Sequence, residues 1–146
     1  MKIFLSLLIT LQLFALQTVD GRQVRVLSDK IEFSGKVNTT QRKTLILQND
    51  SNESATYYLR YLQGNVGSSQ NILICMGENC FDPRNELSQI RFTLASGEVA
   101  TNIYIEFELG ITPTKGTFDL HFFNTSNPRD AFIVENVYNV TSDQPT

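Results

Sequence analysis

The residues whose side chains could most readily do chemistry are Cys75 and Cys80, the only cysteines of the chain. Four residues separate them, within a segment that reads as irregular between strand-like runs. Structural zinc sites need four ligands, and no second pair is present. Redox-active pairs favour the spacing Cys-x-x-Cys at a helix start. The sequence therefore predicts a structural disulfide that closes a small surface loop, with free or intermolecular thiols, or a redox or metal pair, as the alternatives.

The titratable residues that could support catalysis are a histidine and two glutamates. His121 is the only histidine, and it follows Asp119 on what should be the same exposed strand face. Such a pair could act as a base or bind a metal, but it lacks a nucleophile and further ligands. Glu106 and Glu108 also share one strand face, and paired carboxylates hydrolyse glycosides only when they flank a cleft. The simpler interpretation is a solvated histidine and carboxylates that keep the sheet soluble.

The absence of catalytic motifs leads us to expect a protein that is not an enzyme and needs no cofactor or metal. A hydrolase that combines Glu106 or Glu108 with His121 is the weakest of three hypotheses. The stronger candidates for function are three aromatic side chains expected on outward faces, Tyr58, Tyr104 and Phe123. They would form an interaction surface for a protein or a sugar, or they would simply pair across strands.

Five Asn-x-Ser/Thr sequons are candidate N-glycosylation sites if the host glycosylates: Asn38, Asn49, Asn52, Asn124 and Asn139. Turn chemistry offers a second explanation, because polar loops use Asn, Ser and Thr for their local hydrogen bonds.

The elements that must position these residues are strands, because apolar residues recur with a period of two. In residues 102–109 the side chains of Ile103, Ile105, Phe107 and Leu109 face one way, and polar ones face the other. The same alternation predicts that Tyr57, Leu59 and Tyr61 point inward, and the loss of alternation near residues 135–136 predicts a β-bulge. The predicted core comprises Leu45, Leu47, Leu59, Ile90, Phe92, Leu94, Ile103, Ile105, Phe107, Phe118, Leu120 and Phe122.

Turn signals at regular spacing separate these runs, and no helix longer than one turn, near Pro83–Leu87, is expected. The pattern predicts an all-β fold, an antiparallel β-sandwich of seven to nine strands. It should form one domain over residues 22–141, followed by a disordered tail over residues 142–146.

The N-terminus has the layout of a secretory signal peptide, here residues 1–21, with one lysine followed by a short apolar run. Cleavage is expected after Gly21 or as early as Ala15. No later run is long enough to span a membrane. A net charge of −3 with no basic face argues against nucleic acid as a partner.

Several segments together carry a resemblance: "TLILQNDSNESATYYLRYL", "ICMGENCFDP", "FTLASGEVATNIYIEF" and "KGTFDLHFFNTSNPRDAFIVENVYNV". In this order they resemble an immunoglobulin-like β-sandwich module of exported Bacteroidetes-type bacterial proteins. The Leu-x-x-Gly-Glu turn is also similar to the wider group of ASH and major-sperm-protein-like domains. The chain departs from the pattern in having Ala95-Ser96 where a proline is common, no tryptophan and no C-terminal sorting domain. The resemblance implies an Ig-like sandwich that serves as an accessory or interaction domain.

These observations predict an exported, non-enzymatic β-sandwich that acts as a protein-interaction or structural module in a secreted, periplasmic or cell-surface location. Its partner would be another extracellular or envelope protein, engaged by a strand edge or by the Cys75–Cys80 loop. The alternative is a ligand binder, which would hold a glycan on its aromatic face or a lipid between its sheets.

Overall fold

The computed structural model describes residues 23–28 and 30–143. The predicted signal peptide and the end of the predicted tail lie outside the described residues. Within the tail, Asp143 is described, and its Oδ1 lies 3.9 Å from Nζ of Lys36.

Ten strands and one short 3-10 turn form the described chain. The elements are β1 (Val24–Val26), β2 (Ile31–Lys36), β3 (Thr40–Asn49), β4 (Ala55–Gly64), β5 (Asn71–Met76), β6 (Asn79–Phe81), η1 (Leu87–Gln89), β7 (Arg91–Leu94), β8 (Val99–Glu108), β9 (Thr114–Asn124) and β10 (Ala131–Thr141). The count exceeds nine because the segment after Gly77 forms β6, a three-residue strand that pairs with β5.

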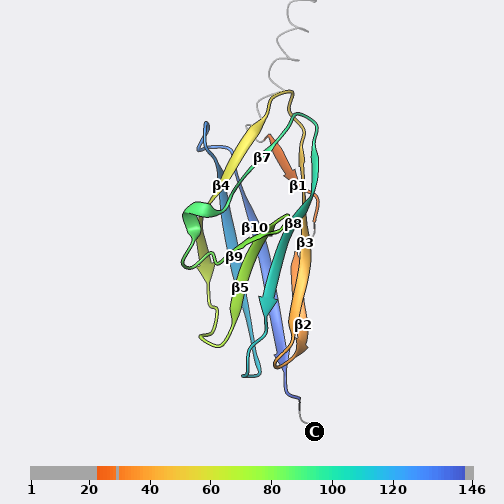
Figure 1. Cartoon of the computed structure of the whole chain (residues 1–146), viewed down its shortest axis with the longest axis vertical. Coiled ribbons are helices and arrows are strands. Elements are labelled where there is room, and N and C mark those ends of the chain that lie inside the picture. Colours follow the sequence, from red (N-terminus) through yellow and green to blue (C-terminus); the bar gives the residue numbers. More distant parts are fainter. Residues whose placement is uncertain (1–22, 29, 144–146) are drawn as a thin grey trace, which may run out of the picture.

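The strands form two five-stranded sheets packed as a sandwich (Figure 1). Sheet A has the order β1-β3-β8-β5-β6, and sheet B has the order β2-β10-β9-β4-β7. Neighbouring strands are antiparallel except β2 and β10, which run parallel. The all-β sandwich is thus confirmed, with one parallel pair that the sequence did not predict.

The core lies between the sheets and is built from the inward residues of every long strand. Of the predicted core residues only Phe92 is half-buried, and the others are buried. Large aromatic side chains fill the interior: the ring centroids of Phe33 and Phe107 lie 5.2 Å apart, and those of Phe122 and Phe132 lie 5.1 Å apart. Such contacts between aromatic rings add to the stability gained from apolar burial.

Two details of the predicted strands were wrong. The register of β4 against β9 shifts between Leu59 and Tyr61, so a bulge at Arg60 turns Tyr61 outward, where it is 42% exposed. Strand β10 pairs without a register shift, and its alternation continues through Asn136, a polar residue that is buried. The apparent break in the apolar pattern of β10 is therefore one inward asparagine, whose Nδ2 donates to the carbonyl of Phe118.

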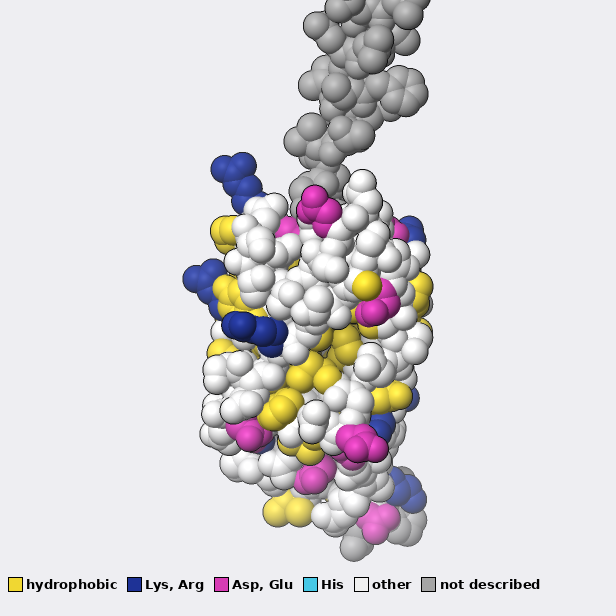
Figure 2. All heavy atoms as spheres, turned by 45° about the horizontal axis from the view of Figure 1, so that its top comes forward, with side chains coloured by type: hydrophobic (Ala, Val, Ile, Leu, Met, Phe, Trp, Pro, Cys, Tyr) yellow, Lys and Arg dark blue, Asp and Glu magenta, His cyan; other side chains and the backbone are white. Residues whose placement is uncertain are grey.

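The surface carries charges of both signs. On the face shown in Figure 2, hydrophobic side chains gather in the middle, while acidic and basic ones lie scattered around them. No helix within the described residues is long and apolar enough to cross a membrane.

Candidate functional site

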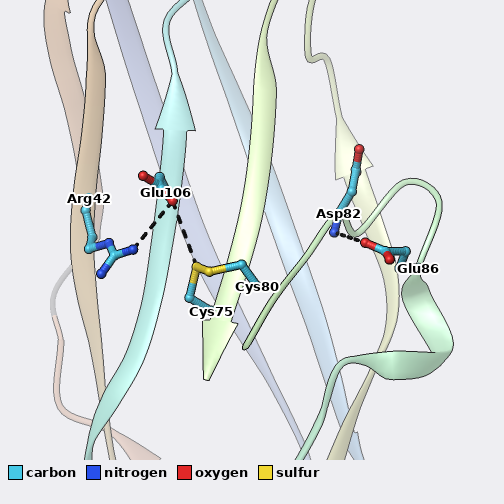
Figure 3. Close-up of a disulfide and its surroundings, with 6 residues drawn as sticks. All are labelled: Arg42, Cys75, Cys80, Asp82, Glu86 and Glu106. Carbon is cyan, nitrogen blue, oxygen red and sulfur yellow. Dashed lines mark hydrogen bonds and ion pairs between the residues drawn. A yellow bond between two sulfur atoms is a disulfide. The ribbon is translucent and has the colours of Figure 1, made fainter. Parts of the chain in front are cut away.

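The two cysteines lie directly opposite each other in a β-hairpin, not in a long irregular loop. Cys75 of β5 pairs with Cys80 of β6, and their sulfur atoms are joined in a disulfide (Figure 3). Only Gly77 and Glu78 connect the last pair of the hairpin, and Gly77 has φ of 64°. A glycine with positive φ at the first position of a two-residue loop is what a tight hairpin turn requires. The predicted disulfide is confirmed, and the prediction of an irregular segment was wrong.

The disulfide packs against an ion pair on the outer face of sheet A. Glu106 Oε2 lies 3.6 Å from Arg42 Nη2 and 4.0 Å from Cys75 Sγ (Figure 3). The second distance is a contact without a hydrogen bond, because a disulfide sulfur carries no proton. Arg42 also lies over the ring of Tyr104, 5.0 Å from its centroid. Cys75, Cys80 and Glu106 come together as metal ligands would, but both sulfur atoms are already bonded to each other.

The two glutamates of β8 are engaged by neighbours across the sheet rather than by each other. Glu106 pairs with Arg42, and Glu108 accepts a hydrogen bond of 2.8 Å from Asn71 Nδ2. The adjoining loop is also closed by its own bonds, since Glu86 accepts the backbone N–H of Asp82 at 2.9 Å (Figure 3). The outer face of sheet A is therefore polar and largely satisfied.

The structure separates these glutamates from the histidine. Glu106 and Glu108 lie on the outer face of sheet A, and His121 lies on β9 with its side chain on the outer face of sheet B. The core separates the two faces, so these side chains cannot act on one substrate. The hypothesis of a hydrolase that combines them was wrong.

The outer face of sheet B carries a cluster that we call the aromatic face: Tyr58, Tyr61, His121, Phe123 and Ile133. The ring centroids of Tyr58 and Phe123 lie 6.4 Å apart, and those of Tyr61 and His121 lie 4.3 Å apart in a stacked arrangement. Ile133, opposite His121 on β10, is 51% exposed. Within this cluster Tyr61 and Ile133 are exposed, and exposed apolar side chains that lie together are a feature of binding sites.

His121 is not the solvated histidine that the sequence predicted. Its position on the outer face was predicted correctly, but the ring is only 9% exposed because Tyr61 covers it. The cover results from the bulge at Arg60, which turns Tyr61 outward. His121 Nε2 is buried and has no hydrogen-bond partner among the described residues. A buried polar atom without a partner costs free energy, and the Oδ1 of Asn136 in the core is a second such atom among the described residues.

The three aromatic residues singled out from the sequence do not form one surface. Tyr58 and Phe123 belong to the aromatic face, whereas Tyr104 lies on sheet A beneath Arg42. The prediction that Tyr61 points inward was wrong, and this side chain belongs to the aromatic face. The only local signal is the spacing of Leu59 and Leu62, which are three residues apart and both pack in or against the core, and it does not by itself reveal a bulge.

In two of the five sequons the asparagine side chain is buried and stabilises a turn. Asn49 is fully buried, and its Nδ2 donates to the carbonyls of Glu53 and Leu94 while its Oδ1 accepts the N–H of Ser51. Asn124 is likewise buried, and its Oδ1 accepts the N–H of Ser126 at 2.8 Å. A glycan on Nδ2 would displace the bonds that this nitrogen donates, to Glu53 and Leu94 at Asn49 and to Asp130 at Asn124.

The other sequons differ in how far they face solvent. Asn38 and Asn52 lie exposed in turns, and Asn139 is half-buried on β10. The fold thus has room for a glycan at Asn38 and Asn52.

A buried polar cluster at one end of sheet B was not predicted at all. The carboxylate of Asp130, which is 1% exposed, accepts hydrogen bonds from the hydroxyl of Tyr57 and from Asn124 Nδ2, the latter at 2.9 Å. Burial raises the pKa of Tyr57 well above its usual value, and the hydrogen bond to Asp130 and its negative charge raise it further. We call these three residues the Asp130 cluster. It joins β4, β9 and the turn before β10.

Comparison with known proteins supports the fold alone. No protein-family model matches the sequence, and a search of the curated proteins found no match. Among solved structures, the ASH / PapD-like domain of human CEP192 (PapD-like domain 7) matches with a TM-score of 0.52 and 13% identity. The match covers 84% of this chain and 87% of that one.

Two bacterial structures are similar to the same extent. The FixG-related protein from Vibrio parahaemolyticus has a TM-score of 0.51 and 14% identity, with 84% of this chain and 99% of that one covered. The secreted serine protease VesC from Vibrio cholerae has a TM-score of 0.53 and 13% identity, with 86% of this chain but only 24% of that one covered. The chain therefore has an Ig-like β-sandwich fold, to which the fold of ASH/PapD-like domains is similar.

Proposed function

We propose that this chain is an exported, non-enzymatic module that binds another extracellular or envelope protein through its aromatic face. The observation that carries the proposal is the exposure of Tyr61 and Ile133 above a histidine whose Nε2 has no described partner. A partner that covered these side chains would bury apolar area, which is the main favourable term in protein association.

Export is supported by the disulfide and by the signal-peptide layout of residues 1–21. Disulfides persist in oxidising compartments and are rare in the cytosol. A non-enzymatic role is supported by the separation of Glu106 from His121 on opposite faces. Origin from Bacteroidetes-type exported proteins, as the resemblance implies, stays a prediction.

A glycan is the second candidate ligand, favoured by the exposed ring of Tyr61, which could stack on a sugar. A lipid between the sheets is disfavoured, because stacked aromatic rings such as Phe107 and Phe118, 5.5 Å apart, fill the interior.

The test is a comparison of matched variants on the two outer faces. The mature protein, tagged and immobilised, should capture a partner from the native extracellular or periplasmic fraction. That partner, once purified, should bind the wild type and Tyr104→Ser equally but bind Tyr61→Ser at least tenfold more weakly. Equal binding to Tyr61→Ser, or no specific partner in repeated captures, would contradict the proposal. Retention on a carbohydrate array that Tyr61→Ser abolishes would support the glycan instead.

A further inference from the structure

A second feature of sheet B lies beside the aromatic face, where one side of β4 is left without a neighbouring strand. Strand β7 pairs with β4 only from Ala55 to Tyr58, and one further bond runs from the N–H of Leu59 to the carbonyl of Ile90. On the other side, β9 pairs with β4 as far as Gly64. The half of β4 from Arg60 to Gly64 therefore has a strand on one side only within the described residues, and η1 packs against β4 where this half begins.

An edge of this kind offers hydrogen bonds to another extended chain. In a β-strand, alternate residues direct their N–H and C=O groups to opposite sides, so part of this half of β4 directs them away from β9. The edge of β2 is protected differently, because the side chain of Gln41 accepts the N–H of Ser34 and donates to its carbonyl. No side-chain hydrogen bond protects the free half of β4 in this way among the described residues, and unpaired edges are templates for strand addition.

An open groove of about 470 Å³ reaches this half of β4 at Arg60, and it is lined by Tyr58, Leu59, Arg60, Asn85, Leu87, Ser88 and Arg91. It lies between β4 and η1, where β7 stops pairing with β4. A groove of this size fits a few residues of a bound chain, not a whole domain.

Two arginines give the groove its chemical preference. Arg60 lies over the ring of Phe123, 5.0 Å from its centroid, and Arg91 pairs across the sheet with Tyr58. Neither guanidinium forms an ion pair with an acidic side chain in the described part of the chain, whereas Arg42 and Arg84 both do. A guanidinium favours carboxylates, which it can bind through two parallel hydrogen bonds.

We propose that this groove binds an extended acidic segment of a partner protein, which adds a strand to the free half of β4 and places carboxylates beside Arg60 and Arg91. The free backbone edge favours a peptide over a sugar, and the two arginines favour an acidic one. The proposal deepens the proposed function and rests on it, because the bound segment would lie next to the aromatic face.

The test uses a fluorescent peptide of about ten residues with alternating Glu and Val, measured by anisotropy against the mature protein. Binding should be saturable, and Arg60→Gln and Arg91→Gln should each weaken it three- to tenfold. Arg129→Gln is the matched control, because Arg129 is exposed in the turn before β10, away from the groove. The same peptide with Lys in place of Glu should not bind. No saturable binding, or equal binding by all three variants, would overturn the proposal.

A third peptide separates strand addition from simple charge attraction. It keeps every Glu but carries an N-methyl group on every residue, which removes the backbone donors on both sides of the strand without changing charge. Loss of binding supports strand addition, and unchanged binding overturns it. A uronic-acid oligosaccharide that competes with the peptide and binds more tightly would likewise overturn the assignment to a peptide. If these peptides fail while the captured partner still depends on Tyr61, the groove proposal falls and the proposed function stands.

Discussion

The two outer faces of the sandwich are built from the same kind of alternating strand, but their side chains are used differently. On sheet A, Glu106, Arg42 and the disulfide satisfy one another, and Glu108 accepts a bond from Asn71. On sheet B, Tyr61 and Ile133 are exposed, and Arg60 has no acidic partner among the described residues. Side-chain contacts on its outer face therefore stabilise sheet A. The outer face of sheet B is left open, so sheet B depends on contacts made by its inner face.

The Asp130 cluster provides buried hydrogen bonds that stabilise sheet B from its inner side. It lies between the sheets at one end of sheet B, where the hydroxyl of Tyr57 and the amide of Asn124 both donate to one carboxylate. The backbone N–H of Gln23, next to β1 of sheet A, also lies 3.4 Å from Asp130 Oδ1. A buried carboxylate is tolerated because it is hydrogen-bonded on several sides.

The largest effect is expected from Asp130→Ala, which breaks these buried hydrogen bonds. It leaves the Tyr57 hydroxyl and the Asn124 amide buried without their acceptor, so the free energy of unfolding should fall by about 3 kcal/mol. Urea denaturation measures the loss, and Asp130→Asn should lose less because it keeps one acceptor. The control is Asp119→Ala on the outer face of the same sheet, expected within about 0.5 kcal/mol of wild type. A loss below about 1 kcal/mol for Asp130→Ala would contradict the role of the cluster.

This cluster could not be predicted from the sequence, for a physical reason. Tyr57 was expected to point inward as an apolar side chain, and its hydroxyl needs an acceptor that lies 73 residues away in the chain. Asn124 and Asp130 looked like ordinary turn residues, and they are turn residues as well. Which turn meets which strand depends on pairing over long distances in sequence, and the alternation of one strand carries no such information.

The period of two was enough to predict the core and the sandwich, because every inward position is fixed once one face is buried. It could not assign a strand to a sheet, so Tyr104 was grouped with Tyr58 and Phe123, although they lie on opposite faces. It also could not detect the bulge at Arg60. A bulge only shifts the phase of the alternation, and Tyr61, being aromatic, fits the inward position of an unbroken strand equally well.

The second effect tests how contacts on its outer face stabilise sheet A. A disulfide that closes so short a loop should contribute about 2 kcal/mol, because the unfolded loop loses little entropy. The variant Cys75→Ser/Cys80→Ser should therefore unfold at lower urea but keep the fold and the binding of the acidic peptide at the groove. Intact mass with and without reductant checks the bond, with a gain of about two mass units on reduction. Loss of peptide binding by this variant would show that the two sheets are not independent.

The third effect is a dependence on pH that arises inside the Asp130 cluster. The folded-state pKa of Tyr57 is raised, so the folded protein holds this proton more tightly than the unfolded chain does. The resulting stability is complete below the unfolded pKa of about 10 and is lost as the pH rises above it, by up to about 1.4 kcal/mol per pH unit. Tyr57→Phe should flatten the fall in unfolding free energy between about pH 10 and 12. An unchanged slope in Tyr57→Phe would show that other groups cause it, Tyr138 first among them, since burial raises its pKa too.

The smallest effect separates a paired arginine from an unpaired one. The side chain of Arg42 is 49% exposed and that of Glu106 is 28% exposed, so solvent screens their attraction. A double-mutant cycle of Arg42→Gln and Glu106→Gln should give a coupling of about 0.5 kcal/mol that vanishes in about 1 M salt. Arg60→Gln removes no ion pair, so the difference in unfolding free energy from the wild type should not depend on salt. The same variant should nevertheless bind the acidic peptide more weakly. If Arg60→Gln instead showed a salt-dependent loss of stability, Arg60 would have an acidic partner in the free protein. The charged side chains on the outer face of sheet B would then have partners, as those on the outer face of sheet A do.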